Sequence, residues 1–189
     1  MQKGILIVDF GSQYTQLIAR RIREKKVYCE IHSFNKITHK LIKKLKPKGI
    51  ILSGGPNSVL DKNSPRLNKS IIEYNFPTLG ICYGLQALTK ENGGVIARSL
   101  SREYGFAKIK ITHNSKIIPK EWLNKYINVW MSHGDHVCKP PKGYKIIAKS
   151  NNNIISIIEN DNKNIYGLQF HPEVHHTYLG HKILANFIF

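Results

Sequence analysis

The sequence predicts an α/β protein in which a doubly wound, mixed and mostly parallel sheet is flanked by helices and carries a small antiparallel extension. Two patterns predict this architecture. In the first half, short apolar runs alternate with segments of helical periodicity, which is typical of βαβ units. After the Gly-Gly pair at 93–94, the chain changes to strand-like pieces in which polar and apolar residues alternate, as in 108–112. Such alternation indicates antiparallel strands with one exposed face.

The elements of the first half follow one another in regular order. Strands are expected at 5–10, 27–34, 49–53 and 78–82, and helices at 13–25, 41–45, 67–74 and 85–91. Ser12 precedes the first helical pattern and is a candidate N-cap. Pro47 is expected to stop the second helix, because proline removes a backbone donor and clashes with the preceding turn.

The second half supplies the extension and the closing elements. Strand-like pieces occur at 108–112, 129–131, 144–148 and 154–158, and a last buried strand is expected at 165–170. An amphipathic helix is expected over 178–189. Its apolar face would carry Leu179, Ile183, Leu184 and Phe187. No repeat or linker interrupts the chain, so we expect a single domain over 1–189.

Composition narrows the class of protein. The chain has 189 residues, of which 41% are hydrophobic and 22% charged, and no apolar run approaches the roughly 20 residues that span a membrane. The apolar run at 5–8 is too short for a secretory signal and is followed by Asp9. The cysteines are scattered without CxxC pairing, which indicates reduced thiols. We therefore expect a cytoplasmic protein without a membrane partner.

The formal net charge of +17 raises the question of a nucleic-acid partner. Lysines occur along the whole chain, however, and the aromatic residues do not interleave with them as a stacking platform requires. No zinc-finger or RNP pattern is present. We therefore expect no nucleic-acid partner and keep a basic nucleic-acid-binding protein as the alternative from another functional class.

The pentapeptide Gly-Ile-Cys-Tyr-Gly at 80–84 lies between an apolar run and a helical pattern. It predicts a sharp strand-to-helix turn that presents Cys82 as a nucleophile, because glycines on either side relieve the crowding of a strained turn. Free backbone N–H groups and the helix dipole at such a turn favour the thiolate. A lone cysteine is more often a small buried hydrophobe, and Cys29 and Cys138 are interpreted in that way.

A cysteine nucleophile needs a base, and His171 is the strongest candidate because it follows the last apolar strand. If the chain stays extended through Pro172, the side chains of His171 and Glu173 project to the same side, so the carboxylate can orient the imidazole. Each motif alone is weak evidence. Their joint occurrence at the carboxyl ends of predicted strands predicts Cys82, His171 and Glu173 as catalytic residues.

Two further sequence patterns can be interpreted either as functional sites or as ordinary structural features. Ser-Gly-Gly-Pro at 53–56 follows a predicted strand and is either a simple turn or an oxyanion hole, in which a glycine N–H pairs with the N–H of Tyr83. Histidines cluster near the C-terminus at 171, 175, 176 and 181, as in a metal site. Because Pro172 interrupts their spacing and no cysteine accompanies them, we expect no metal.

Three motifs together resemble the class I (triad) glutamine amidotransferases: Ser-Gly-Gly-Pro at 53–56, Gly-Ile-Cys-Tyr-Gly-Leu-Gln at 80–86 and Gln-Phe-His-Pro-Glu at 169–173. The resemblance covers essentially the whole chain and implies a flavodoxin-like fold. The segments at 8–14, 101–105, 130–135 and 171–174 more narrowly resemble the amidotransferase domains of the GMP synthases.

The resemblance implies roles for particular residues. Cys82, His171 and Glu173 would form the triad, with Gly55 and Tyr83 supplying the oxyanion N–H groups. The amino-acid end of L-glutamine would be bound by Gln86, Ser132, His133 and Asp135. Cys82 would attack the carboxamide, His171 would protonate the departing ammonia, and water would hydrolyse the thioester.

The resemblance also implies a partner. Ammonia would pass to an ATP pyrophosphatase (synthetase) domain or subunit of GMP synthase, where ATP and Mg²⁺ serve to aminate XMP to GMP, while this domain would need no cofactor. A Ser-Gly-Gly-x-Asp-Ser pyrophosphate loop is missing from this sequence, and its motifs favour a domain of a fused chain over a separate subunit.

Two alternatives remain within the same family of folds. The amidotransferase component of anthranilate or aminodeoxychorismate synthase shares the triad, but the segments at 101–105 and 130–135 favour the GMP synthases. A catalytically silent channelling or allosteric module is disfavoured, because all three triad residues are present.

Overall fold

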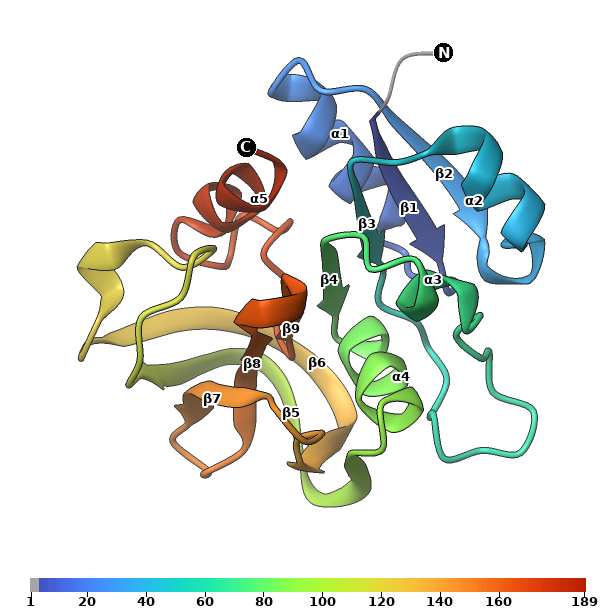
Figure 1. Ribbon diagram of the computed structural model, residues 1–189. Helices are drawn as coiled ribbons and strands as arrows, with labels where there is room; N and C mark the ends of the chain where they lie inside the picture. Colours follow the sequence, from blue (N-terminus) through green and yellow to red (C-terminus); the bar gives the residue numbers. More distant parts are fainter. Residues whose placement is uncertain (1–3) are drawn as a thin grey trace.

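The computed structural model describes residues 4–189, except for the side chains of 99–102. Ser101 and Arg102 of the motif at 101–105 thus lie outside the described side chains. Within the described residues, nine strands form one sheet in the order β2-β1-β3-β4-β9-β8-β7-β5-β6 (Figure 1). The strands are β1 (Ile5–Asp9), β2 (Cys29–Ser33), β3 (Gly49–Leu52), β4 (Thr78–Ile81), β5 (Val95–Ile111), β6 (Tyr126–Lys139), β7 (Lys145–Ser150), β8 (Ile155–Asn160) and β9 (Ile165–Leu168). The helices are α1 (Thr15–Glu24), α2 (His39–Leu45), α3 (Ser70–Glu73), α4 (Tyr83–Glu91) and α5 (Gly180–Ile188).

The pairing of the strands confirms the predicted fold class. β2, β1, β3, β4 and β9 pair in parallel, in the strand order of flavodoxin-like sheets. β8, β7, β5 and β6 pair antiparallel. This extension contains the two longest strands, β5 with 17 residues and β6 with 14. Register shifts interrupt their pairing between Val95 and Ile96 and between Arg98 and Glu103, which breaks the alternation that sequence patterns detect.

Apolar side chains on alternate sides of the parallel strands build two hydrophobic cores. Ile5 and Ile7 of β1 belong to the core that also holds residues of α1 and α5. Leu6 and Val8 belong to the core on the opposite face, with residues of α2, α3 and α4. Both faces of these strands are therefore covered, which explains why they are continuous apolar runs in the sequence. Figure 1 shows α1 and α5 next to each other on one side of the sheet.

Several predicted helix boundaries change in the structure. Helix α1 begins at Thr15 with Tyr14 at its N-cap, so the prediction that Ser12 is the N-cap is wrong. The Ser12 hydroxyl instead accepts a hydrogen bond from the Tyr14 N–H in the turn before the helix (3.0 Å). Helix α2 ends before Pro47, as predicted, with Lys46 in a left-handed conformation. Helix α3 has four residues and is shorter than the helix expected over 67–74.

The closing helix buries the face that the sequence predicts. Ile183 and Leu184 of α5 are fully buried, and Leu179 and Phe187 pack against the same core at its margin. Among the described residues, every helix is too short or too polar to cross a lipid bilayer.

Candidate active site

Cys82 lies on a strained turn between β4 and α4. It is the N-cap of α4 and has φ 51° and ψ −105°, a conformation that residues other than glycine rarely adopt. Its N–H donates to the carbonyl of Leu168 (2.7 Å), and its carbonyl accepts from the N–H of Gln86 (3.2 Å). The last residue of β9 and the first turn of α4 thus fix the backbone on both sides of the cysteine, which offsets the strain.

The two glycines of the pentapeptide allow the helix to approach the sheet. A Cβ atom on Gly80 would lie 2.7 Å from the backbone nitrogen of Leu85, and one on Gly84 would lie 2.3 Å from the carbonyl oxygen of Leu52. Backbone atoms cannot yield as the end of a flexible side chain can. The spacing of the glycines therefore reflects the close packing of the turn against β3 and α4, in addition to the strain at Cys82.

The Cys82 sulfur is surrounded by polar groups of three segments. The thiol lies 3.5 Å from the carbonyl oxygen of Ser132, and the Gln169 amide nitrogen lies 3.8 Å from the sulfur. A Cβ atom on Gly54 would lie 3.0 Å from Cε1 of His171 and 3.7 Å from Cβ of Cys82. The structure thus brings Cys82, His171 and the Gly-Gly turn together.

Both the side chain and the backbone of His171 make contacts that fix its position. Its Nδ1 lies 2.7 Å from Oε1 of Glu173, and both side chains are buried. Its N–H donates to the carbonyl of Trp130 (3.0 Å), and its own carbonyl accepts from the Thr177 hydroxyl (2.6 Å). The ring of Tyr14 packs edge-on against the imidazole, with centroids 5.1 Å apart. Because Glu173 occupies Nδ1, the other ring nitrogen is left for the cysteine.

The electrostatics of this pair favour a charged histidine. Burial by itself lowers the pKa of His171, but the negative charge of Glu173 and the contacts with Cys82 and Glu173 outweigh it and raise the pKa well above 6.5. Among the described side chains, Oε2 of Glu173 is buried without a hydrogen-bond partner. Glu173 therefore interacts with the imidazole through one carboxylate oxygen.

A pocket of about 540 Å³ opens in front of Cys82. Gly55 and Tyr83 line it, as does the loop that follows β3. Tyr83 begins helix α4, so its backbone N–H belongs to the first turn, where N–H groups have no acceptor within the helix. A Cβ atom on Gly55 would lie 2.7 Å from the carbonyl oxygen of Phe10, so only glycine fits there. Both candidate oxyanion groups therefore border the same space as the cysteine.

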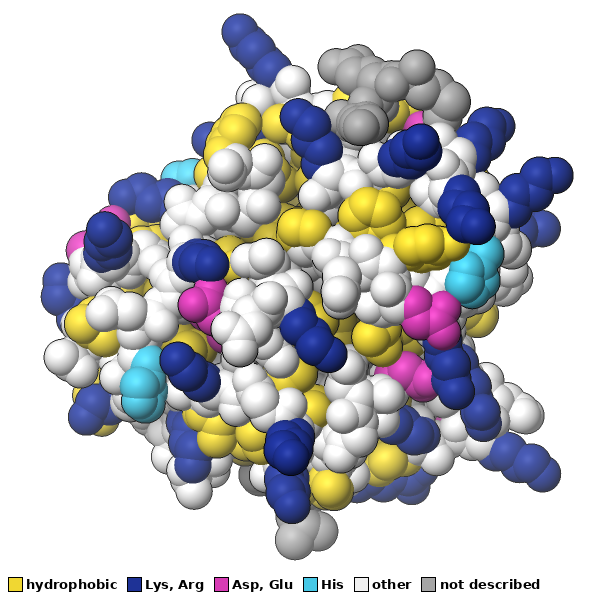
Figure 2. Space-filling view, in the orientation of Figure 1, with side chains coloured by type: hydrophobic (Ala, Val, Ile, Leu, Met, Phe, Trp, Pro, Cys, Tyr) yellow, Lys and Arg dark blue, Asp and Glu magenta, His cyan; other side chains and the backbone are white. Residues whose placement is uncertain are grey.

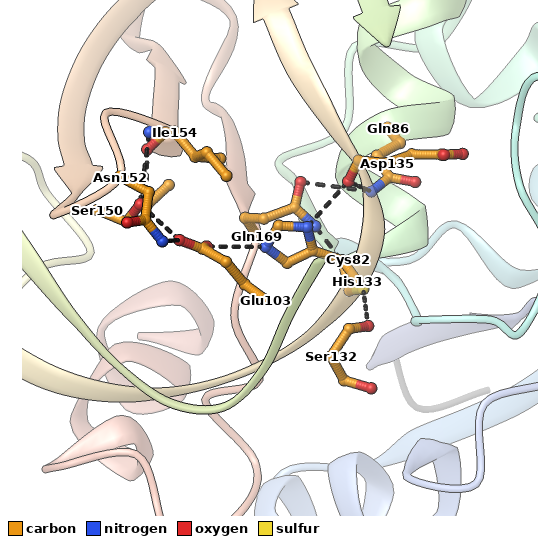
Figure 3. Close-up of polar contacts among 11 residues, drawn as sticks. Cys82, Gln86, Glu103, Ser132, His133, Asp135, Ser150, Asn152, Ile154 and Gln169 are labelled. Atoms are coloured by element: carbon orange, nitrogen blue, oxygen red, sulfur yellow. Dashed lines mark hydrogen bonds and ion pairs between the residues drawn. The ribbon is translucent and has the colours of Figure 1, made fainter. Parts of the chain in front are cut away.

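Residues 132–135 of strand β6 form a wall of this pocket, and Figure 3 shows the polar contacts of Ser132, His133 and Asp135 in this segment. Gln86 donates from Nε2 to the carbonyl of Asp135 (2.8 Å), and the Asp135 carboxylate accepts from the Ser58 hydroxyl. Ser132 and His133 also line the pocket. The two ring nitrogens of His133 are occupied by protein acceptors, with Nδ1 3.0 Å from the Asp135 carbonyl and Nε2 3.1 Å from Oε2 of Glu103.

Three residues of this site were not predicted as site residues from the sequence. Gln169, which contacts the Cys82 sulfur and lies 3.4 Å from the Gln86 amide, is two residues before His171. The two-residue period of an extended chain would have placed it on the same side as His171. Glu103 belongs to the motif at 101–105, but neither it nor Ser58 in the loop after β3 carries a local signal for its contact, because the partners are distant in the sequence.

The clustered histidines make aromatic contacts. The ring of His176 stacks on Trp130 with centroids 4.4 Å apart, and His175 lies 3.7 Å from His176. Within residues 4–189, no group of three or more His, Cys, Asp or Glu residues is arranged to hold a metal ion.

The basic side chains are dispersed. Figure 2 shows Lys and Arg side chains distributed around the visible face, with acidic and hydrophobic side chains between them. Several lysines and arginines pair with carboxylates, as Lys116 does with Asp161 (2.6 Å) and Arg98 with Asp61 (2.7 Å).

Comparisons with known proteins assign the chain to one family. Residues 6–189 match the family described as glutamine amidotransferase class-I. The chain is 50% identical over 185 residues to the glutamine-hydrolyzing GMP synthase of Brachyspira hyodysenteriae, covering 98% of this chain and 35% of that protein. It is also 50% identical over 188 residues to the protein of the same name from Caldanaerobacter subterraneus, covering 100% of this chain and 36% of that protein. The chain thus spans about a third of the length of these curated relatives.

A solved structure agrees over nearly its full length. A protein from Thermoplasma acidophilum, described as a putative subunit of GMP synthase, superposes with a TM-score of 0.84 at 30% sequence identity, covering 100% of this chain and 93% of that chain. A glutamine amidotransferase from Thermotoga maritima, at 20% identity and a TM-score of 0.73, shares the fold.

Proposed function

The chain belongs to the class I glutamine amidotransferases, and from this premise we propose that it hydrolyses L-glutamine to glutamate and delivers the ammonia to GMP synthesis. The observation that carries the proposal is the strained turn at Cys82 beside the buried His171–Glu173 pair. A nucleophile, a base and a group that orients the base are the minimum for acyl transfer through a thioester.

The reaction begins with the glutamine side chain in the pocket of about 540 Å³. The Cys82 thiolate attacks the carboxamide carbon, and the backbone N–H groups of Gly55 and Tyr83 stabilise the oxyanion of the tetrahedral intermediate. His171, protonated because of Glu173, gives its proton to the departing nitrogen, and ammonia leaves. His171 then takes a proton from water, which hydrolyses the thioester and releases glutamate.

The wall formed by β6 is proposed to bind the amino-acid end of the substrate. Asp135 is buried, with 7% of its surface exposed, and its carboxylate accepts a hydrogen bond from the Ser58 hydroxyl. This carboxylate can pair with the α-ammonium group of glutamine. The proposed ligands on the same wall are Ser132 and the segment around His133, with Gln86 supporting them from α4.

The ammonia is proposed to serve an ATP pyrophosphatase domain or subunit of GMP synthase, which uses ATP and Mg²⁺ to convert XMP to GMP. Two observations support this: the relatives at 50% identity carry the name GMP synthase, and this chain spans about a third of their length. The amidotransferase part itself is proposed to need no cofactor and to lie in the cytoplasm with its cysteines reduced, since all three cysteines are free.

The test replaces the nucleophile. Glutamate release is measured for the wild-type chain and for Cys82→Ala, alone and with a synthetase partner loaded with ATP, Mg²⁺ and XMP. We expect weak activity alone, stimulation by the loaded partner, and loss of activity in the variant. Cys138 is exposed, so its interpretation as a buried residue is wrong, and it does not line the pocket. Cys138→Ala is therefore the matched control and should behave as wild type. Full glutaminase activity in Cys82→Ala would refute the proposal.

A further inference from the structure

Two sequence motifs that lie far apart in the chain meet inside the protein. Glu103, from the motif at 101–105, and His133, from the motif at 130–135, contact each other with 3.1 Å between Oε2 and Nε2. Their side chains are 6% and 1% exposed, respectively. Figure 3 shows the Glu103 carboxylate between the His133 ring on one side and Ser150 and Asn152 on the other.

The Glu103 carboxylate is fully engaged. Its Oε1 accepts hydrogen bonds from the Ser150 hydroxyl (2.9 Å) and the Asn152 amide (2.9 Å), and its Oε2 faces His133. Burial by itself raises the pKa of Glu103, but the hydrogen bonds from His133, Ser150 and Asn152 outweigh it and hold the pKa below its usual 4.5. Glu103 is therefore a buried carboxylate anion.

Both ring nitrogens of His133 face oxygen atoms of the protein. A neutral imidazole donates from one nitrogen and accepts at the other. Here Nδ1 faces the Asp135 carbonyl (3.0 Å) and Nε2 faces the ionised carboxylate of Glu103, so both partners are acceptors. Both contacts are satisfied only when the ring is an imidazolium. The ionisable groups beside it are Glu103 from β5 and Asp135 and His136 from its own strand, while Gln86 of α4 and Gln169, just after β9, are neutral amides.

This ion pair is connected to the cysteine through the pocket wall. The Asp135 carbonyl that accepts from His133 also accepts from Gln86 (2.8 Å), which is on helix α4, the helix that Cys82 caps. In the same strand, the carbonyl of Ser132 lies 3.5 Å from the Cys82 thiol. Segment 132–135 is therefore fixed between Glu103 behind it and the turn at Cys82 in front of it.

We propose that Glu103 is a positioning residue for substrate binding: its carboxylate keeps His133 as an imidazolium, and the pair holds segment 132–135 of β6 at the distance from Cys82 that glutamine requires. The ring of His133 then stabilises the pocket wall through its contacts with Glu103 and the Asp135 carbonyl, and it does not bind the substrate. Ser150, at the end of β7, and Asn152, in the turn after it, orient the Glu103 carboxylate. This proposal rests on the proposed glutaminase function.

The kinetic test separates positioning from general stability. KM and kcat for glutamine are measured with the loaded synthetase partner for Glu103→Ala, Glu103→Gln and Asn152→Ala. We expect KM to rise about tenfold in Glu103→Ala and about threefold in the two milder variants, with kcat changing by less than about threefold. A variant that merely unfolds in part lowers the apparent kcat at unchanged KM, so the split identifies positioning. Asn151→Ala, in the same exposed turn, is the matched control and should keep the wild-type KM.

A spectroscopic test addresses the charge without any substrate. In ¹⁵N-histidine-labelled protein at neutral pH, both ring nitrogens of His133 should show the protonated shift in wild type and in Asn151→Ala. In Glu103→Gln, the glutamine amide can donate to Nε2, so the ring should become neutral with the proton on Nδ1.

The outcomes distinguish this proposal from the function on which it rests. Unchanged KM in both Glu103 variants, a loss confined to kcat, or a neutral His133 in wild type would each overturn the proposal. If wild type and partner released no glutamate from glutamine, the proposed function would fail, while the ¹⁵N spectrum would still decide whether the imidazolium exists.

Discussion

The parallel and antiparallel halves of the sheet contribute to the pocket in different ways. In the parallel half, strands of four or five residues end at one edge: β4 leads directly into Cys82, and His171 lies three residues after the end of β9. In the antiparallel half, β5 and β6 are 17 and 14 residues long, and the pocket wall lies within β6. The turn at Cys82 is thus fixed mainly by backbone contacts, whereas the wall depends, besides the pairing of β6 with β5, on hydrogen bonds made by side chains.

This difference predicts how each half responds to mutation. Changes at the ends of the parallel strands should affect the chemical step or the stability of the fold, because the backbone there is packed closely against its neighbours. Changes along β6 should affect binding of glutamine, because a wall held by side chains can shift without loss of the fold.

The largest effect is expected at the base. His171→Ala removes the group that is proposed to carry protons in both half-reactions and should lower kcat for glutamate release by about a thousandfold. Steady-state kinetics with the loaded partner measure it, and His175→Ala, at an exposed ring four residues further on, serves as control. A loss smaller than about tenfold would mean that the parallel half does not supply the base.

The next effect tests the backbone of the turn. Gly84→Ala would place a Cβ atom 2.3 Å from the carbonyl oxygen of Leu52, and we expect it to lower the free energy of unfolding by about 3 kcal/mol. Urea unfolding followed by circular dichroism measures this change. In Gly49→Ala the nearest atom, Cδ1 of Ile5 at 3.3 Å, is at the end of a side chain and can move, so a loss of at most about 1 kcal/mol is expected. Equal losses in the two variants would contradict the close approach of the turn to β3.

A smaller effect is expected in the antiparallel half. Asp135→Asn removes the charge proposed to face the α-ammonium group and should raise KM for glutamine about tenfold, with kcat nearly unchanged. Asp161→Asn removes a carboxylate that pairs with Lys116 at the surface and should leave KM as in wild type. If Asp135→Asn lowered kcat and left KM unchanged, the proposed division of roles between the two halves would be wrong.

The smallest effect is a dependence of stability on pH. Because the pKa of His171 is raised in the folded protein, its charged form adds stability that is fully present below about pH 6.5 and is lost as the pH rises through the folded-state value. Glu173→Gln removes the charge that raises this pKa. The difference in free energy of unfolding between wild type and Glu173→Gln should therefore decrease as the pH rises above neutral. A difference that stays constant with pH would show that Glu173 does not act through the charge of His171.

The fold class and the ends of the parallel strands follow from the amino-acid sequence without any coordinates. Buried parallel strands are continuous apolar runs, and the residues that follow them must lie at one edge of the sheet, so the positions of Cys82 and His171 were predictable from local pattern. The structure brings these residues together, along with Gly55 and Tyr83. The need for glycine at 80 and 84 was also predictable from the sequence, because their spacing reflects backbone contacts within one turn.

The extent of the long antiparallel strands and the contacts that hold the pocket wall emerge only from the packed structure. Register shifts in β5 break the two-residue period, so the sequence showed only fragments such as 108–112. The pairing of Glu103 with His133 and of Ser58 with Asp135 joins residues 30 and 77 positions apart. Such contacts depend on how the two halves of the sheet pack, and no local periodicity records them. Local pattern thus specified where the candidate catalytic residues lie, whereas long-range hydrogen bonds specified the shape of the site around them.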